Sequence, residues 1–145
     1  MEICKATSFD EIFNVLKLCS DSFYEQSYNE ENKINELANK YYSCAETAIA
    51  YEYGSVLGFA SYYLKKITDN TAFLSMLIVK GEFQGKGVGK ALLDFVIDDC
   101  KCNFVEKIRL EVNTQNSKAI LLYEKKGFKK ECAASDKSDY FILEM

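Results

Sequence analysis

Three glycines separated by single residues occur in the segment Gln84–Lys90, which reads QGKGVGK and follows an apolar run. Because glycine has no side chain, successive backbone N–H groups in such a turn can converge on an anion. The helix expected after it adds unpaired N-terminal N–H groups and the positive end of its dipole. This segment, here named the glycine loop, therefore predicts a phosphate-binding site. Its two lysines add positive charge, although a flexible turn with solvated lysines ahead of a helix is the alternative.

Spacing excludes two common phosphate motifs at this position. A P-loop has four residues between its first glycine and Gly-Lys-Ser/Thr, and Gly81 lies one residue too close to Gly85. The dinucleotide fingerprint needs a third glycine three residues after its second. That position falls on Lys90 or Leu92, so neither a mononucleotide nor a dinucleotide loop is predicted.

The segment Phe23–Glu31 contains both aromatic and acidic residues. Ring faces and carboxylates together suit a cationic amine, which makes Tyr24, Glu25 and Tyr28 candidate substrate residues. An ordinary surface loop whose tyrosines fold back onto the core is the alternative.

Composition excludes several other classes of chemistry and partner. The chain has no histidine, which excludes imidazole catalysis and the Ser-His-Asp triad. A net charge of −4 argues against a nucleic-acid partner. The four lysines between positions 125 and 130 fit a solvated helix end, with contact to an anionic ligand as the alternative. Six cysteines lack zinc-site spacing, so we expect reduced core thiols and no metal.

No apolar run approaches the roughly twenty residues of a membrane helix, and the first residues, MEICK, do not resemble a secretory signal. We therefore expect a cytoplasmic protein with no membrane partner. A length of 145 residues fits one domain, residues 1–145.

Hydrophobic periodicity predicts the elements that position these residues. Helices are expected over about Phe9–Phe23, where Ser8 and Glu11 form a capping box, and over Glu30–Tyr42, Val88–Cys102 and Asn116–Gly127. Strands are expected at Ile3–Ala6, Thr47–Tyr53, Val56–Leu64, Ala72–Val79, Lys107–Val112, Phe128–Ala134 and Tyr140–Leu143. Turns are expected at Gly54-Ser55, Thr68-Asp69-Asn70 and Ser135–Ser138. This order predicts a mixed α/β (α+β) fold with helices on both faces of one sheet.

Two motifs together carry a family likeness. The first is Leu77-Ile78-Val79 followed by Gln84-x-x-Gly87-x-Gly89, and the second is Asn116, Ala119, Leu122-Tyr123 and Gly127-Phe128. In order and spacing the chain resembles the GCN5-related N-acetyltransferases (GNAT) across almost its whole length. The resemblance implies the GNAT fold, with a central, mixed, mostly antiparallel sheet of six to seven strands.

The resemblance also implies the residues of the site. The residues implied in acetyl-CoA binding are Leu77, Ile78, Val79, Gln84, Gly85, Lys86, Gly87, Val88, Gly89, Lys90, Asn116 and Tyr123. Tyr123 would protonate the leaving thiolate, and a core tyrosine with its hydroxyl at the rim is its alternative. The segment around Glu111 is similar to the ribosomal-protein alanine N-acetyltransferases, in which the matching glutamate is the base. An exposed strand residue is the alternative for Glu111.

Some positions depart from the family pattern. Ser75 and Met76 stand where many members have a carboxylate, and Gly81 replaces the usual proline. The hairpin between Phe128 and Tyr140 lacks the arginine and tyrosine of the ribosomal-protein enzymes, which puts a protein N-terminus as substrate in doubt.

The expected activity is acetyl-CoA-dependent N-acetyl transfer, by direct attack of a primary amine on the thioester. The acceptor would be a small-molecule amine, a protein N-terminus or a lysine, and the chain a monomer or a homodimer. A non-catalytic acyl-CoA-binding sensor or regulatory module is the alternative.

Overall fold

The computed structural model describes residues 1–67 and 70–145. Its strands are β1 Glu2–Lys5, β2 Glu46–Glu52, β3 Ser55–Ile67, β4 Thr71–Val79, β5 Lys107–Asn113, β6 Lys129–Ala133 and β7 Ser138–Glu144. Its helices are α1 Phe9–Cys19, α2 Glu31–Cys44, α3 Val88–Cys102 and α4 Ser117–Lys125, with 3-10 turns η1 Ser20–Ser22, η2 Gln26–Asn29 and η3 Gly81–Phe83. Two residues of the turn predicted at 68–70 lie outside the described part, and the third, Asn70, has φ +55°.

The strands form a seven-stranded sheet in the order β1-β2-β3-β4-β5-β7-β6. Pairing is parallel between β4 and β5, and antiparallel between β1 and β2, β2 and β3, β5 and β7, and β6 and β7. The expected mixed, mostly antiparallel sheet is thus confirmed. The placement of helices on both faces stays a prediction.

The chain divides into two compact units. The first comprises residues 1–62 and 76–96, and the second comprises residues 63–75 and 97–145. No break in the chain separates them, because β3, β4 and α3 each contribute residues to both units.

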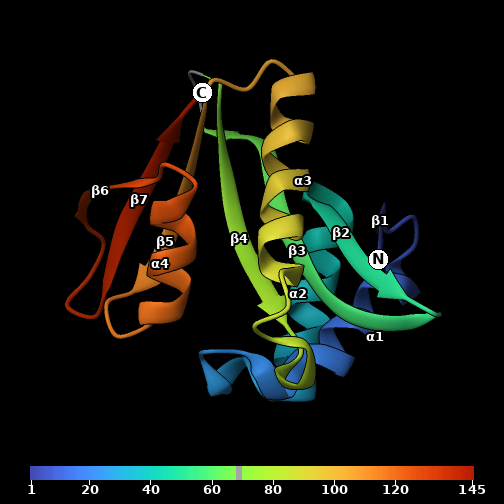
Figure 1. Cartoon of the computed structure of the whole chain (residues 1–145). Helices are drawn as coiled ribbons and strands as arrows, with labels where there is room; N and C mark the ends of the chain where they lie inside the picture. Colours follow the sequence, from blue (N-terminus) through green and yellow to red (C-terminus); the bar gives the residue numbers. More distant parts are fainter. Residues whose placement is uncertain (68–69) are drawn as a thin grey trace. The chain divides into compact units, whose positions relative to one another are not determined.

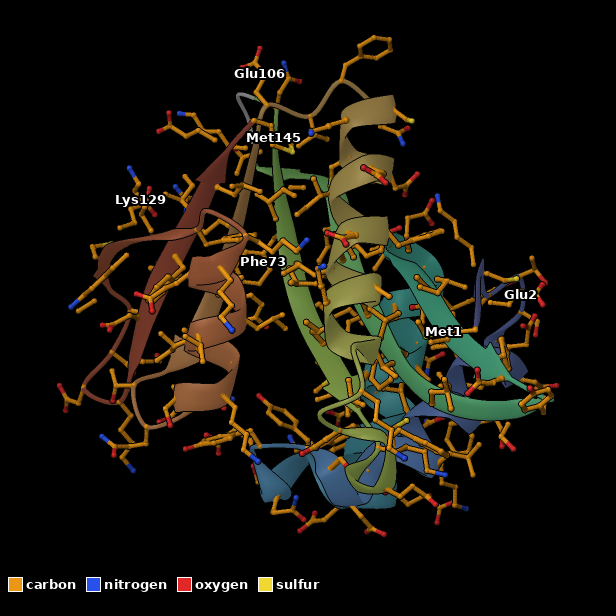
Figure 2. The ribbon with its side chains drawn as sticks, viewed as in Figure 1. Met1, Glu2, Phe73, Glu106, Lys129 and Met145 are labelled. Carbon is orange, nitrogen blue, oxygen red and sulfur yellow. The ribbon has the colours of Figure 1, made fainter. Side chains whose placement is uncertain are left out.

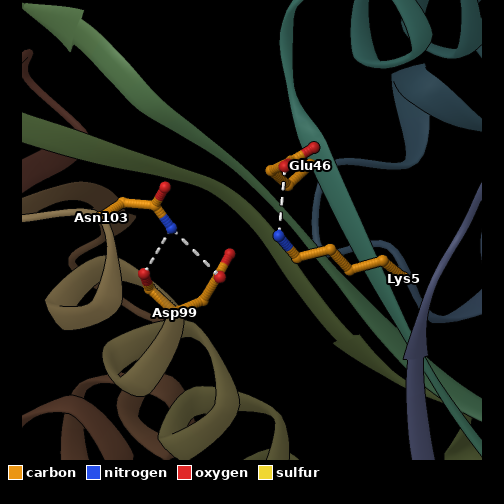
Figure 3. A network of polar contacts seen from close by, with 4 residues as sticks. All are labelled: Lys5, Glu46, Asp99 and Asn103. Carbon is orange, nitrogen blue, oxygen red and sulfur yellow. Dashed lines mark hydrogen bonds and ion pairs between the residues drawn. The ribbon is translucent and has the colours of Figure 1, made fainter.

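In the first unit, β1, β2 and the first part of β3 are neighbouring strands (Figure 1). Figure 3 shows the ion pair that joins the first two, with 3.1 Å between Lys5 Nζ and Glu46 Oε1. At the start of α1, Ser8 Oγ accepts a hydrogen bond from Glu11 N, as the capping box predicts. The return bond differs, because the carboxylate of Glu11 accepts from Thr7 N rather than from Ser8 N.

The second unit is built on β5, which pairs with β4 from Thr71 to Leu74 and with β7 along its full length. Met145 N donates to Glu106 O at 3.0 Å, which continues the pairing of β5 with β7 by one residue, and both residues are labelled in Figure 2. At the C-terminal end of α3, Asn103 Nδ2 donates to Asp99 O and to its carboxylate (Figure 3).

Strand β6 ends the sheet, and its five residues are exposed. Lys130 pairs with Phe141 and Cys132 with Tyr140, so Glu131 between them is an extra residue that forms a β-bulge. Its carboxylate makes a two-bond contact with the guanidinium of Arg109 on β5, at 2.8 and 3.0 Å.

Three expectations about local structure were wrong. Helix α1 ends at Cys19, not Phe23, because the chain tightens into the 3-10 turn η1, where Ser20 Oγ donates to Lys17 O. The first hairpin turns at Tyr53-Gly54, both with positive φ, and not at Gly54-Ser55. Only two of the six cysteines, Cys19 and Cys100, are buried; the other four are exposed.

Candidate functional site

The glycine loop connects β4 to α3 and lies within the first unit. Gly85 has φ +77° and Gly87 has φ +87°, values that a residue with a side chain rarely adopts. No atom lies within 4 Å of the position that a Cβ would take at either residue, so the wall of the loop is open there. Alternation of left-handed and right-handed backbone turns successive N–H groups to one side, which is the geometry of an anion-binding nest.

The start of α3 continues this wall. Ala91 N donates to Gly87 O at 3.1 Å, so the regular helical hydrogen bonds begin directly after the second left-handed glycine. The N–H groups of the first turn, in Val88, Gly89 and Lys90, have no partner within the helix by geometry. They add to the positive end of the helix dipole, which favours an anion.

Hydrogen bonds tie Gln84, and the residues just before the glycine loop, to β4, β3 and η1. Gln84 Nε2 donates to Val79 O at 3.0 Å, which closes the loop back onto the strand. Lys80 N donates to Leu57 O at 2.9 Å, and Gly81 N donates to Ser22 Oγ at 3.1 Å. The role of Gln84 in this structure is therefore to shape the loop.

The charge at the loop is mainly positive. Lys80 Nζ and Lys86 Nζ each lie 5.9 Å from the centre of the Phe83 ring, and Lys80 also pairs with Glu82 at 3.5 Å. Phe83 and Lys80 were not predicted as site residues. Their sequence signal is weak, because a lysine beside an aromatic residue occurs on many surfaces.

In the described pairs, β4 is hydrogen-bonded to β5 only from Thr71 to Leu74. The last residues of β4, Leu77–Val79, lie beyond this paired part. All three residues are half-buried. Their main-chain groups thus lie on a strand segment that leads directly into the glycine loop.

The candidate substrate residues also lie in the first unit, in the turn between η1 and α2. Tyr24 is 49% exposed and Tyr28 is 40% exposed, and Glu25 is exposed as well. These exposures contradict the alternative in which both tyrosines fold back onto the core. They leave two rings and a carboxylate accessible to a ligand.

In the second unit, Asn116 is the N-cap of α4. Its Oδ1 accepts a hydrogen bond from Ala119 N at 3.4 Å. Tyr123 follows on the same helix and is 7% exposed, with its ring centre 5.7 Å from that of Phe128. Burial raises the pKa of the Tyr123 phenol well above its ordinary value of 10.0, so the hydroxyl is protonated at neutral pH.

Glu111 lies on β5 with its side chain exposed. Its Oε2 accepts a short hydrogen bond of 2.6 Å from Ser138 Oγ, and that hydroxyl also contacts Ser135 Oγ at 2.9 Å. Ser138 was not predicted at the site. It follows from the pairing of β5 with β7, which brings together residues that are 27 positions apart.

No group of side chains in the described part of the chain is arranged to hold a metal ion. Among the same residues, no helix is both long and apolar enough to cross a membrane. The four lysines near the end of α4 divide between helix, turn and strand, and Lys130 pairs with Asp139 at 3.6 Å.

Comparison with known proteins adds independent evidence. The chain is 32% identical over 125 residues to spermidine N(1)-acetyltransferase of Thermoplasma acidophilum, covering 86% of this chain and 74% of that protein. It is 35% identical over 69 residues to the ribosomal protein bS18-alanine N-acetyltransferase of Escherichia coli (strain K12), covering 48% and 47%. The chain thus spans about half the length of the curated relatives that it matches in this way.

Among solved structures, the fold is similar to that of the PaiA N-acetyltransferase from Thermoplasma acidophilum in complex with coenzyme A. The TM-score is 0.79 at 21% identity, and the alignment covers 100% of both chains. The sequence model of the Acetyltransferase (GNAT) family matches residues 9–128. The likeness seen in the two motifs is thereby confirmed, and the chain belongs to the GNAT acetyltransferase family.

Proposed function

We propose that the protein is an acetyl-CoA-dependent N-acetyltransferase that acts on a primary amine. The observation that carries the proposal is the glycine loop, with two left-handed glycines directly ahead of α3 in a chain of the GNAT family. The left-handed φ values of Gly85 and Gly87 support a site for the pyrophosphate of a coenzyme, because such backbone can turn successive N–H groups toward one anion. Relatives of this chain are named as amine acetyltransferases, which supports an amine as acceptor.

The loop residues Gln84–Lys90 bind the pyrophosphate through main-chain N–H groups and lysine charge in this proposal. The backbone of Leu77–Val79 pairs with the pantetheine arm and donates to the thioester oxygen as negative charge develops on it. Acetyl-CoA supplies the activated acetyl group. The protein orients the thioester and the amine, and such positioning accounts for much of the lowering of the barrier.

Two residues of the second unit have proposed roles in proton transfer. Tyr123 donates a proton to the departing thiolate, and its burial supports this role because the hydroxyl stays protonated at neutral pH. Asn116 orients the coenzyme beside the start of α4.

A protonated amine with a pKa of about 10.4 must lose a proton before attack. Glu111 is the proposed base. Its carboxylate is accessible and is oriented by Ser138, two features that suit proton acceptance from an arriving amine.

The exposed rings of Tyr24 and Tyr28 and the carboxylate of Glu25 are proposed to contact the acceptor. An acceptor with a second positive charge gains from both cation–π contact and ion pairing. This favours a polyamine or a lysine-rich peptide over a neutral amine.

The proposal is tested by measuring release of free thiol from acetyl-CoA with spermidine, an N-terminal alanine peptide and a lysine peptide. Turnover with at least one of them is expected, and mass spectrometry of the product identifies the acetylated nitrogen. Tight binding of CoA without turnover on any amine would instead support the non-catalytic acyl-CoA sensor. Absence of CoA binding would contradict both functions.

A further inference from the structure

Gly58 on β3 lies very close to the backbone of β4. A Cβ at this position would lie 2.4 Å from Ile78 O and 3.0 Å from Val79 Cα, and both of these atoms belong to the backbone. Backbone cannot rotate away as the end of a side chain can. The φ of Gly58 lies outside the left-handed region, so the glycine is required by space and not by conformation.

The same part of β3 is irregular. Ala50 pairs with Gly58, but Tyr51 pairs with Val56, so Leu57 is an extra residue opposite β2. The carbonyl of this extra residue accepts the hydrogen bond from Lys80 N at 2.9 Å. A bulge commonly redirects the strand that carries it. At this bulge β3 contacts the end of β4 at two adjacent points. Leu57 O accepts the hydrogen bond from the residue that follows Val79, and the absence of a side chain at Gly58 lets β3 approach the backbone just before that residue.

We propose that Gly58 is a positioning residue for the coenzyme, through its contact with the carbonyl of Ile78. The inference rests on the proposed function, in which the backbone of Leu77–Val79 pairs with the pantetheine arm. A Cβ at position 58 forces the carbonyl of Ile78 away by about 1 Å, from 2.4 Å to an ordinary contact of 3.4 Å. Displacements of about this size cost an enzyme on the order of tenfold to a hundredfold in rate.

The experiment compares Gly58→Ala with wild type in binding two ligands by calorimetry. CoA carries the pantetheine arm, whereas adenosine 3′,5′-bisphosphate ends at its phosphates and has no such arm. We expect Gly58→Ala to bind CoA about tenfold more weakly, which corresponds to about 1.4 kcal/mol of binding free energy. Binding of the bisphosphate should change less than twofold, because the glycine loop itself is unaltered. A general loss of fold would weaken both ligands together.

Ile49→Val is the matched control for loss of packing. Ile49 is 1% exposed on β2 in the same unit, where it pairs with Phe59 next to Gly58. This variant should bind both ligands as wild type does, despite a lower melting temperature.

A second pair of variants tests the same anchor without adding bulk at Gly58. Lys80 has φ −57°, which proline adopts, so Lys80→Pro removes the N–H that bonds to Leu57 O and places a ring carbon there. Lys80→Ala loses the same charge but keeps the N–H. We expect Lys80→Pro to bind CoA several-fold more weakly than Lys80→Ala, with equal binding of the bisphosphate.

The outcomes separate this inference from the proposed function. Wild-type protein that binds no CoA contradicts the proposed function. Wild type that binds CoA, with a folded Gly58→Ala variant that binds within twofold of it, overturns the role of Gly58 alone. If Gly58→Ala does not fold, the Lys80 variants decide the matter: equal affinities of Lys80→Pro and Lys80→Ala for CoA overturn the proposed positioning of β4 by β3.

Discussion

At the scale of single residues, the two candidate catalytic side chains lie in different environments. One is a buried, protonated phenol that can donate a proton, and the other is an exposed carboxylate that can accept one. Tyr123 is buried against Phe128, which keeps its phenol neutral. Glu111 is exposed and accepts a hydrogen bond from Ser138. A proton donor and a proton acceptor in contrasting environments are the arrangement expected of general acid–base catalysis.

Tyr123→Phe tests the donor. The variant keeps the ring and its contact with Phe128 but removes the hydroxyl, so thiolate departure loses its proton source. We expect kcat to fall by about a hundredfold while CoA affinity stays within about twofold. Thiol release and calorimetry measure the two quantities. Tyr53→Phe, at a fully exposed tyrosine, is the control, and an unchanged kcat in Tyr123→Phe would remove this residue from the mechanism.

Cys19 makes stability depend on pH at the alkaline end. Burial raises the pKa of its thiol from the ordinary 9.0 to about 11, with a smaller opposing effect of Lys80. Since the unfolded thiol ionises first, the contribution to stability is complete below pH 9 and is lost as pH rises to 11. Two pKa units correspond to roughly 2–3 kcal/mol.

Urea unfolding at pH 8 and pH 11 in reducing buffer measures this effect. The free energy of unfolding should fall by about 2 kcal/mol more in wild type than in Cys19→Ala. Lysines and tyrosines titrate in both proteins, so they cancel in the comparison. Equal falls in the two proteins would show that the thiol has no such role.

At the scale of elements, the glycine loop depends on its backbone conformation more than on its side chains. Gly85 and Gly87 adopt left-handed φ values, and Gln84 bonds to the end of β4. The start of α3 follows directly. We propose that the strand, the bent loop and the helix N-terminus together bind an anion.

Gly87→Ala tests the loop against Gly81→Ala, which lies in equally open space but without a positive φ. An alanine in the left-handed region costs about 1–2 kcal/mol, and relief of that strain would rotate the N–H groups. We expect CoA affinity to fall about tenfold in Gly87→Ala and to stay within twofold in Gly81→Ala. Similar losses in both variants would mean that loop flexibility, not the left-handed turn, matters.

At the scale of the whole molecule, both compact units share strands and a helix. β3, β4 and α3 each continue without interruption from one unit into the other. Each unit therefore contains only part of these three elements. A unit that unfolded alone would have to melt part of each shared element. We therefore propose that residues 1–145 fold as a single domain.

Calorimetry tests the single-domain proposal. One transition is expected, with the calorimetric enthalpy equal to the van't Hoff enthalpy. Saturating CoA should raise the midpoint of that transition as a whole, since a ligand stabilises the entire cooperative unit. Two separable transitions, of which CoA shifts only one, would instead identify two domains.

Sequence patterns predicted the features that repeat locally. The helices show their apolar periodicity, the buried start of β4 is an apolar run, and Asn116 caps α4 as its residue type suggests. Each depends on residues close together in the chain. The turn that contains the glycine loop was predictable for the same reason, whereas phosphate binding at this loop stays a prediction.

Features that depend on distant pairing escaped prediction. The contact of Ser138 with Glu111 requires the register of β5 against β7, which no local pattern specifies. The crowding at Gly58 is likewise set by a strand some twenty positions away. A local feature also escaped prediction. Tyr53 adopts a left-handed conformation that its residue type disfavours, so the turn between β2 and β3 was predicted one residue too late in the sequence.

The bulge at Glu131 has a consequence for behaviour at high concentration. An outermost strand normally presents unpaired N–H and C=O groups on which another chain can grow. In β6 the extra residue interrupts the regular spacing of those groups, and its carboxylate is drawn inward to Arg109. Lys129 adds a positive charge that repels the same charge on a second copy aligned alongside. This border of the sheet is therefore a poor template for fibril growth.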